Sequence, residues 1–91
     1  MTELEQARQI ISETDREMAK LFERRMDAVR QVAAYKRRHG LPIEDAAREE
    51  EVIARALPEI SCAEYRPHFA ALLRCMMEGA KALQRSWLEQ S

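Results

Sequence analysis

The chain begins with a long run of residues whose apolar positions repeat with the spacing of an α-helix. The first 39 residues contain no glycine and no proline, and apolar side chains recur every three to four positions, as in an amphipathic helix. We expect one helix from about Glu3 to His39, ended by Gly40 and by Pro42 just beyond it. Such a helix would be about 55 Å long, more than two short helices of the same chain can cover.

Helix-breaking and capping residues divide the remainder of the chain into two shorter helices. Asp45 can cap a second helix that runs through Leu57 and is closed by Pro58. A third helix is expected to start near Glu64, with Pro67 in its first turn, and to continue to the C-terminus. Its core-facing stripe is expected to comprise Phe69, Leu72, Leu73, Met76, Ala80, Leu83 and Trp87. The pattern predicts an all-α fold of three helices, one of them very long.

Three cationic residues, Arg8, Arg25 and Lys36, lie on the apolar stripe of the first helix. An unpaired cation in such a position is strongly destabilising, so each one needs an anionic partner from the protein or from a ligand. Arg25 and Lys36 lie about 16 Å apart on one face, so their long side chains can converge on one small molecule.

Arg8 lies about 25 Å along the helix from Arg25, too far to join that site within one chain. An antiparallel partner helix could present its own Arg8 there, and a second copy would also cover the apolar stripe. The sequence therefore predicts an intertwined antiparallel homodimeric helical bundle, in which Arg8 contributes to the neighbouring subunit's site.

Composition narrows the class of protein. With 91 residues, 46% hydrophobic and two glycines, residues 1–91 are expected to form a single helical domain. The net charge of −1 gives no overall basic field for nucleic acid or an anionic membrane. No apolar run approaches the roughly 18 residues of a membrane span, and a cytoplasmic location is expected. Cys62 and Cys75 lack the spacing of a zinc site or a disulfide framework, so we expect free thiols and no metal.

The second and third helices carry further polar candidates. Asp45, Arg48 and Glu49 share one face of the first turn of the second helix. An arginine there can bind a carboxylate through two hydrogen bonds, and a glutamate can accept one from a hydroxyl. An Asp45–Arg48 pair on a solvated surface is the alternative interpretation. Gln84 lies at the edge of the apolar stripe of the third helix, where by itself a glutamine is more often a structural polar residue.

Taken together, these polar residues resemble the all-helical chorismate mutase family over essentially the whole chain. The residues that carry the resemblance, in chain order, are Arg8, Asp15, Arg25, Lys36, Asp45, Arg48, Glu49 and Gln84. Any one pair would be common by chance, whereas the full set at these intervals has few competing explanations.

The resemblance implies an isomerase that converts chorismate to prephenate in phenylalanine and tyrosine synthesis, without a cofactor. Chorismate is a dianion that rearranges in one unimolecular pericyclic step, so the enzyme needs no nucleophile. It must hold a compact conformer and stabilise charge on the ether oxygen as the bond to it breaks. By similarity to the family, Arg25, Arg48 and Arg8 of the other chain would hold the two carboxylates.

The same resemblance assigns the remaining contacts of the substrate. Lys36 and Gln84 would donate hydrogen bonds to the ether oxygen, and Glu49, with help around Asp45, would accept one from the ring hydroxyl. One position departs from the family pattern, because Ala80 stands where many members have a serine that helps bind a carboxylate. We expect this departure to weaken binding by about 1 kcal/mol rather than to remove the chemistry.

Two other functions compete with this interpretation. A lyase on the same scaffold, which eliminates pyruvate from isochorismate, would use Arg8, Arg25 and Lys36 equally well. A non-catalytic helical dimer would need Arg25 only to set the register of a packed seam. The second alternative leaves Lys36, Arg48 and Gln84 without a role.

Overall fold

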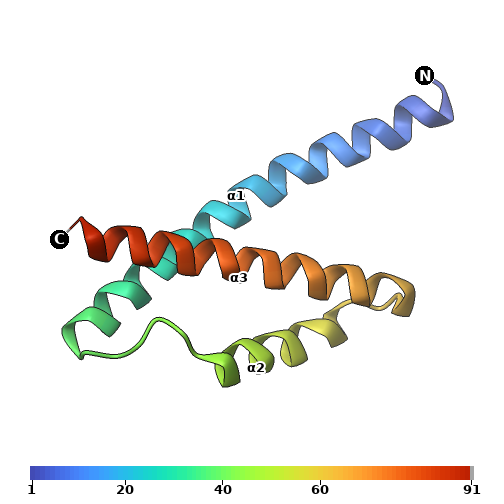
Figure 1. Cartoon of the computed structure of the whole chain (residues 1–91). Coiled ribbons are helices and arrows are strands. Elements are labelled where there is room, and N and C mark those ends of the chain that lie inside the picture. The colour runs from blue at the N-terminus through green and yellow to red at the C-terminus, as the bar shows by residue number, and fades with distance from the viewer. Residues whose placement is uncertain (91) are drawn as a thin grey trace.

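In the computed structural model, which describes residues 1–90, three α-helices are joined by short turns (Figure 1). The helical elements in chain order are α1 Glu3–Arg38, α2 Ala46–Ala56, the 3₁₀ turns η1 Leu57–Glu59 and η2 Ala63–Tyr65, and α3 Arg66–Glu89. Residues 1–90 contain no strand. The predicted all-α fold with one very long helix is therefore confirmed.

The ends of α1 follow from residues that satisfy its free backbone groups. The Thr2 hydroxyl accepts a hydrogen bond from the backbone N–H of Glu5, 3.1 Å away, and so caps the first turn. At the other end the helix stops at Arg38, with His39 as the capping residue. Gly40 follows with a φ of +63°, a left-handed conformation that glycine adopts without steric cost.

The starts of α2 and α3 depend on different local devices. The Asp45 carboxylate accepts the backbone N–H of Arg48 at 3.0 Å, which makes Asp45 the N-cap of α2, as predicted. α3 starts at Arg66, with Pro67 in its first turn, where the missing N–H of proline has no helical partner to lose. The turn η2 precedes it, so the predicted start near Glu64 corresponds to this 3₁₀ turn rather than to α3 itself.

The apolar core lies between α2 and α3. Its buried members are Ile53 of α2 and Leu73 and Met77 of α3. Partly buried side chains pack round them: Val52, Ala56, Leu57, Phe69 and Ala70. Both α1 and α2 pack against α3 rather than against each other, so a space between α1 and α2 remains for the site.

The buried face of α3 differs from the predicted stripe. The buried residues of this helix are Leu73, Met77, Ala80, Lys81 and Gln84. Leu72 and Leu83, which were expected in the core, are 47% and 41% exposed. Apolar residues occupy more than one face of α3, and the positions of α1 and α2 decide which face is covered. The predicted stripe is therefore confirmed at Leu73 and Ala80 and wrong at Leu72 and Leu83, because the covered face is rotated toward Met77, Lys81 and Gln84.

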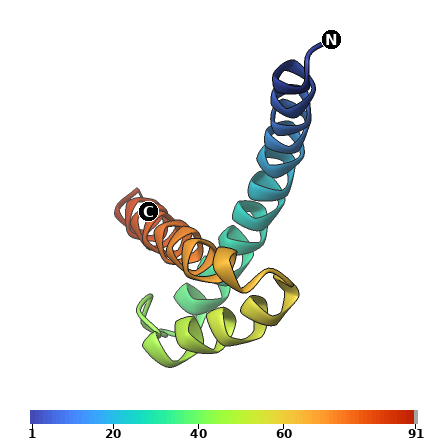
Figure 2. The ribbon, with the colours of Figure 1, turned by 90° about the vertical axis from the view of Figure 1, so that its right-hand side faces the viewer.

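The two halves of α1 have different surroundings. Figures 1 and 2 show that α3 crosses the C-terminal half of α1, whereas the N-terminal half extends away from the other helices. Every residue from 1 to 24 is exposed. The chain measures 55 Å along its longest axis, which is about the length expected for α1 alone at 1.5 Å per residue.

No helix within residues 1–90 has both the length and the apolar character needed to cross a bilayer.

Candidate active site

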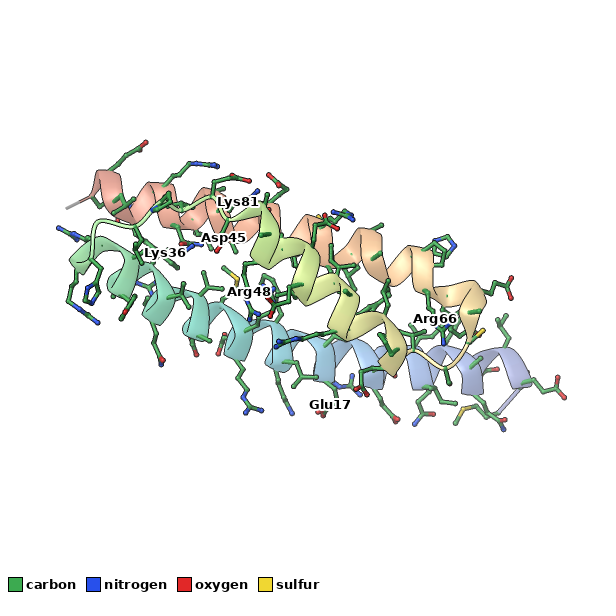
Figure 3. All side chains as sticks on the ribbon, turned by 90° about the horizontal axis from the view of Figure 1, so that it is seen from below. Glu17, Lys36, Asp45, Arg48, Arg66 and Lys81 are labelled. Carbon is green, nitrogen blue, oxygen red and sulfur yellow. The ribbon has the colours of Figure 1, made fainter. Side chains whose placement is uncertain are left out.

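A cavity of about 270 Å³ lies where the C-terminal half of α1, the start of α2 and the last turns of α3 face one another. Its polar lining comprises Arg25, Lys36, Asp45, Arg48, Glu49, Lys81 and Gln84. Figure 3 shows Lys36, Asp45, Arg48 and Lys81 grouped in this region, with Glu17 of the N-terminal half lying apart from them. Apolar residues, among them Val29 and Met77, complete the wall. A concave site with a few converging polar groups is typical of small-molecule binding.

Seven of the eight predicted site residues line this cavity. They come from all three helices and from the segment before α2: Arg25, Lys36, Asp45, Arg48, Glu49, Ala80 and Gln84. Arg8 is the exception, because it lies on the exposed N-terminal half of α1. Its absence from this chain's cavity agrees with the separation of about 25 Å that the helical rise gives between Arg8 and Arg25.

Arg25 and Gln84 present polar atoms that have no partner within residues 1–90. Arg25 Nη1 and Gln84 Oε1 are both buried, and neither makes a hydrogen bond to the described part of the chain. A buried, unpaired group of this kind loses its hydration without compensation. Since both residues line the cavity, a ligand bound there could supply the missing partners.

Lys36 connects the cavity to the segment between α1 and α2. Its Nζ donates a hydrogen bond to the backbone carbonyl of Ile43 at 3.0 Å. An ammonium group has three N–H donors, so two remain after this contact. No carboxylate of residues 1–90 forms an ion pair with Lys36, and its positive charge is therefore available to an anion in the cavity.

The first turn of α2 is organised differently from the Asp45–Arg48 pair considered as an alternative. Asp45 meets the backbone of Arg48 rather than its guanidinium. The guanidinium instead contacts Glu51, with 3.0 Å between Nη1 and Oε1, and both side chains are about half exposed. An exposed pair of this kind contributes little stability and is readily exchanged for another anion. Arg48 can therefore turn to a ligand in the cavity that it lines.

Residues 7–85 match the family described as chorismate mutase type II. The chain belongs to this family. The match spans both halves of α1 and reaches Gln84, so it includes every predicted site residue. No solved structure matched the chain. Membership supports a chorismate mutase type of activity and agrees with the resemblance drawn from the sequence.

Lys81 is a residue of the cavity lining that was not predicted from the sequence. It is 8% exposed and contacts three carboxylates, those of Glu44, Glu49 and Glu78. Because its hydrogen bonds to Glu78, Glu44 and Glu49 favour the charged ammonium, its pKa is raised well above the ordinary value for lysine. The reciprocal contact lowers the pKa of Glu78. The residues that carry the family resemblance do not include Lys81, which is why it was not anticipated.

The charges that line the cavity are predominantly positive. Four lining side chains are cationic and two are anionic. Lys81 is matched by carboxylates, and Arg48 by the exposed Glu51, whereas Arg25 and Lys36 have no carboxylate partner within residues 1–90. This distribution leaves a net attraction for an anionic ligand at the α1 side of the cavity.

Proposed function

We propose that the chain converts chorismate to prephenate in the cavity between α1, α2 and α3, as a step of phenylalanine and tyrosine synthesis. The observation that carries the proposal is the buried Arg25 Nη1 without a partner in residues 1–90. It lies in a cavity whose other lining groups include Lys36, Arg48 and Gln84. A dianionic substrate supplies what this arrangement lacks.

The arginines hold the two carboxylates of the substrate. Arg25 reaches the cavity from α1 and Arg48 from α2, so the two guanidinium groups approach a bound molecule from different helices. Each can donate two parallel hydrogen bonds to a carboxylate. Fixing both ends of a flexible dianion restricts it to the compact conformer in which the reacting carbon atoms meet.

Lys36 and Gln84 stabilise the ether oxygen. As the rearrangement proceeds, the bond between the ring carbon and this oxygen breaks, a new carbon–carbon bond forms, and negative charge grows on the oxygen. The two free donors of Lys36 and the amide N–H of Gln84 can both be directed to it. Such donors act most strongly when they are already in place before the charge develops. The step is an isomerisation, so the chain needs no nucleophile and no cofactor.

Glu49 accepts a hydrogen bond from the ring hydroxyl. Its side chain is 23% exposed and lies in the cavity wall, one residue after Arg48. Asp45 contributes indirectly, because its cap of α2 fixes the first turn from which Arg48 and Glu49 extend. Ala80 is 6% exposed and lines the same cavity, where its methyl group offers no hydrogen bond.

A second copy of the chain completes the site. The stripe that leads into the cavity continues over the N-terminal half of α1, where Leu4, Ile11, Met18 and Phe22 are between 47% and 58% exposed. Large apolar side chains at helical spacing on an unsupported helix favour association. An antiparallel partner would cover this stripe and bring Arg8 of the partner subunit to the substrate carboxylates near Arg25.

Product identification tests the function. The purified chain is mixed with chorismate and, separately, with isochorismate, and the loss of ultraviolet absorbance is followed by analysis of the products. We expect prephenate from chorismate, formed about a hundredfold or more slowly by Arg25→Ala at the same concentration. Salicylate and pyruvate from isochorismate, with chorismate unchanged, would instead identify a lyase. Turnover of neither compound by a folded dimer would support a non-catalytic module.

A further inference from the structure

Lys81 is a buried cation whose hydrogen-bonding capacity is fully used by the protein. Its Nζ lies 2.8 Å from Glu78 Oε1, 2.9 Å from Glu44 Oε1 and 2.9 Å from Glu49 Oε1. A lysine ammonium has three N–H donors, and three carboxylates accept them. No donor of Lys81 is left for a ligand, although the side chain lines the cavity.

The three carboxylates belong to different parts of the chain. Glu78 precedes Lys81 by one turn of α3, Glu49 lies in the first turn of α2, and Glu44 lies in the segment between α1 and α2. Arg85 adds a weaker contact to Glu44, with 3.5 Å between Nη2 and Oε2. In Figure 3 the Lys81 label lies beside the start of α2, near Asp45. Lys81 thus ties α3 to both segments that bound the cavity.

Stability alone is a weak reason for this arrangement. A buried ion pair is often no more stabilising than apolar residues of similar size, and the neighbours of Lys81 on the buried face include Met77 and Ala80. A methionine at position 81 would extend that apolar face without removing any charge from water. The charge of Lys81 therefore points to a role at the cavity.

We propose that Lys81 is a positioning residue, which acts through Glu49 and holds its carboxylate in the orientation that accepts the substrate hydroxyl. The inference rests on the proposed function, because that function assigns the hydroxyl contact to Glu49. Lys81 contacts Oε1 of Glu49, whereas no ion pair within residues 1–90 involves Oε2. One oxygen is fixed by the protein and the other is free for the substrate.

The charges round Glu49 give the arrangement a pH dependence. Charged groups reach the Glu49 region from every element packed against it: Arg25 and Lys36 of α1, Glu44 and Asp45 before α2, Arg48 of α2, and Arg74 and Lys81 of α3. Of these, Lys81 makes the direct contact to the Glu49 carboxylate. Its removal would leave the carboxylates of Glu44, Glu49 and Glu78 without the cation between them, which favours protonation within this group.

The test compares the pH profile of kcat/KM for chorismate in Lys81→Met, Lys81→Arg and the parent chain. We expect Lys81→Met to reduce kcat/KM about tenfold near neutral pH, mainly through a higher KM, as a contact to a charged group is lost. Because an ionised carboxylate accepts the hydroxyl more strongly than the protonated acid, the acid limb of Lys81→Met should move to higher pH. Lys81→Arg keeps the charge and should restore the parent profile.

Glu78→Gln is the matched control. Glu78 contacts the same ammonium, but its side chain is 70% exposed and does not line the cavity. Its replacement should leave kcat/KM within about twofold of the parent value, because the Lys81–Glu49 contact remains. Circular dichroism checks that each variant is folded. Lys81→Gln replaces Lys81→Met if the latter unfolds, with the same expected shift of the acid limb.

The outcomes separate the inference from the function on which it rests. A parent chain that converts chorismate, together with a Lys81→Met profile of unchanged shape and position, would overturn only the role of Lys81. If Glu78→Gln lowered kcat/KM as much as Lys81→Met does, the role of Lys81 would also be overturned, because the loss would then reflect a general effect on packing. A folded parent chain without any chorismate turnover would remove the proposed function and this inference together.

Discussion

The two halves of α1 share one apolar stripe but meet different surroundings. In the C-terminal half, Arg25, Val29 and Lys36 are partly buried and line the cavity beneath α2 and α3. In the N-terminal half, Ile11 and Phe22 lie on the continuation of that stripe at 58% and 47% exposure. A single helix thus carries one stretch that the chain covers itself and one that it leaves uncovered.

This difference shows why a helical stripe has to be considered together with the length of its helix. Both halves carry cations on the stripe, Arg8 in one and Arg25 and Lys36 in the other. A folded monomer can use only the second set, since α2 and α3 do not reach the first. In our proposal the exposed half serves the site of a second copy, so experiments that separate the two halves test it most directly.

The largest effect is expected from pairs of inactive variants. Arg8→Ala and Arg25→Ala should each lower kcat/KM by about a hundredfold or more, because each removes a cation from the charged substrate. Mixed in equal amounts with subunit exchange, they should recover about one quarter of parental activity, since half of the dimers are hybrids with one intact site of two. Activity is measured before and after exchange, which native mass spectrometry verifies.

Arg25→Ala mixed with Lys36→Ala is the control for that experiment. Both residues lie in the same half of α1, so each site of a hybrid dimer would carry one defect and no recovery is expected. Recovery in this control, or none in the first mixture despite exchange, would contradict a site shared between the two halves of α1.

The apolar stripe of the exposed half can be disrupted by one charge. Ile11→Glu should raise the dimer dissociation constant by about a hundredfold, because association would bury an unpaired carboxylate. Gln9→Glu adds the same side chain on the opposite, exposed face of α1 and should leave association unchanged. Sedimentation velocity over a dilution series measures both. A monomeric parent chain, or equal effects of the two substitutions, would argue against this stripe as the interface.

The C-terminal half of α1, which α3 covers, is tested through Gln84 of α3, since Gln84 lines the same cavity. Gln84→Glu should reduce kcat/KM about tenfold or more at neutral pH, because a carboxylate cannot donate to the ether oxygen. Activity should recover as the pH falls, since the protonated acid regains a donor. Gln84→Ala has no such group and should show no acidic recovery. If kcat/KM of Gln84→Glu depended on pH in the same way as that of the parent chain, the amide of Gln84 would not contact the reacting ether oxygen.

The smallest effect is expected from restoring a hydroxyl to the cavity wall. Ala80→Ser should lower KM for chorismate by about fivefold, which corresponds to about 1 kcal/mol from one added hydrogen bond. Ala82→Ser makes the same change at an exposed position of α3 and should have no effect. Steady-state kinetics of the two variants decide the matter, and an unchanged KM in Ala80→Ser would mean that its hydroxyl does not meet the substrate.

Local signals in the sequence were sufficient to predict the helices and most of the cavity lining. The cap by Asp45 and the left-handed Gly40 depend on residues next to the helix ends, so the boundaries could be read within a few positions. The spacing of Arg25 and Lys36 placed them on one helical face, and both line the cavity. These features depend on the period of the helix and on neighbouring residues alone.

Contacts between distant segments were not predictable in the same way. Lys81 meets Glu44 across 37 positions of sequence, and nothing in its local pattern marks it as buried. The exposed Leu72 and Leu83 show the same limit, because an apolar residue on α3 becomes core only if another helix covers it. Arg48 likewise pairs with Glu51 rather than with Asp45, whose carboxylate caps the helix backbone.

The sequence by itself determined that this protein forms three helices and that cations interrupt the apolar stripe of the first. It also determined that the first helix is too long to be covered by the other two helices of the same chain. Helical periodicity is a local property, so these conclusions need no knowledge of packing. The tertiary structure decided which face of α3 is buried, which cations remain without a carboxylate partner, and that Lys81 joins three carboxylates at the cavity. Those outcomes depend on how α2 and α3 lie against α1, because burial and ion pairing are fixed only when the helices pack.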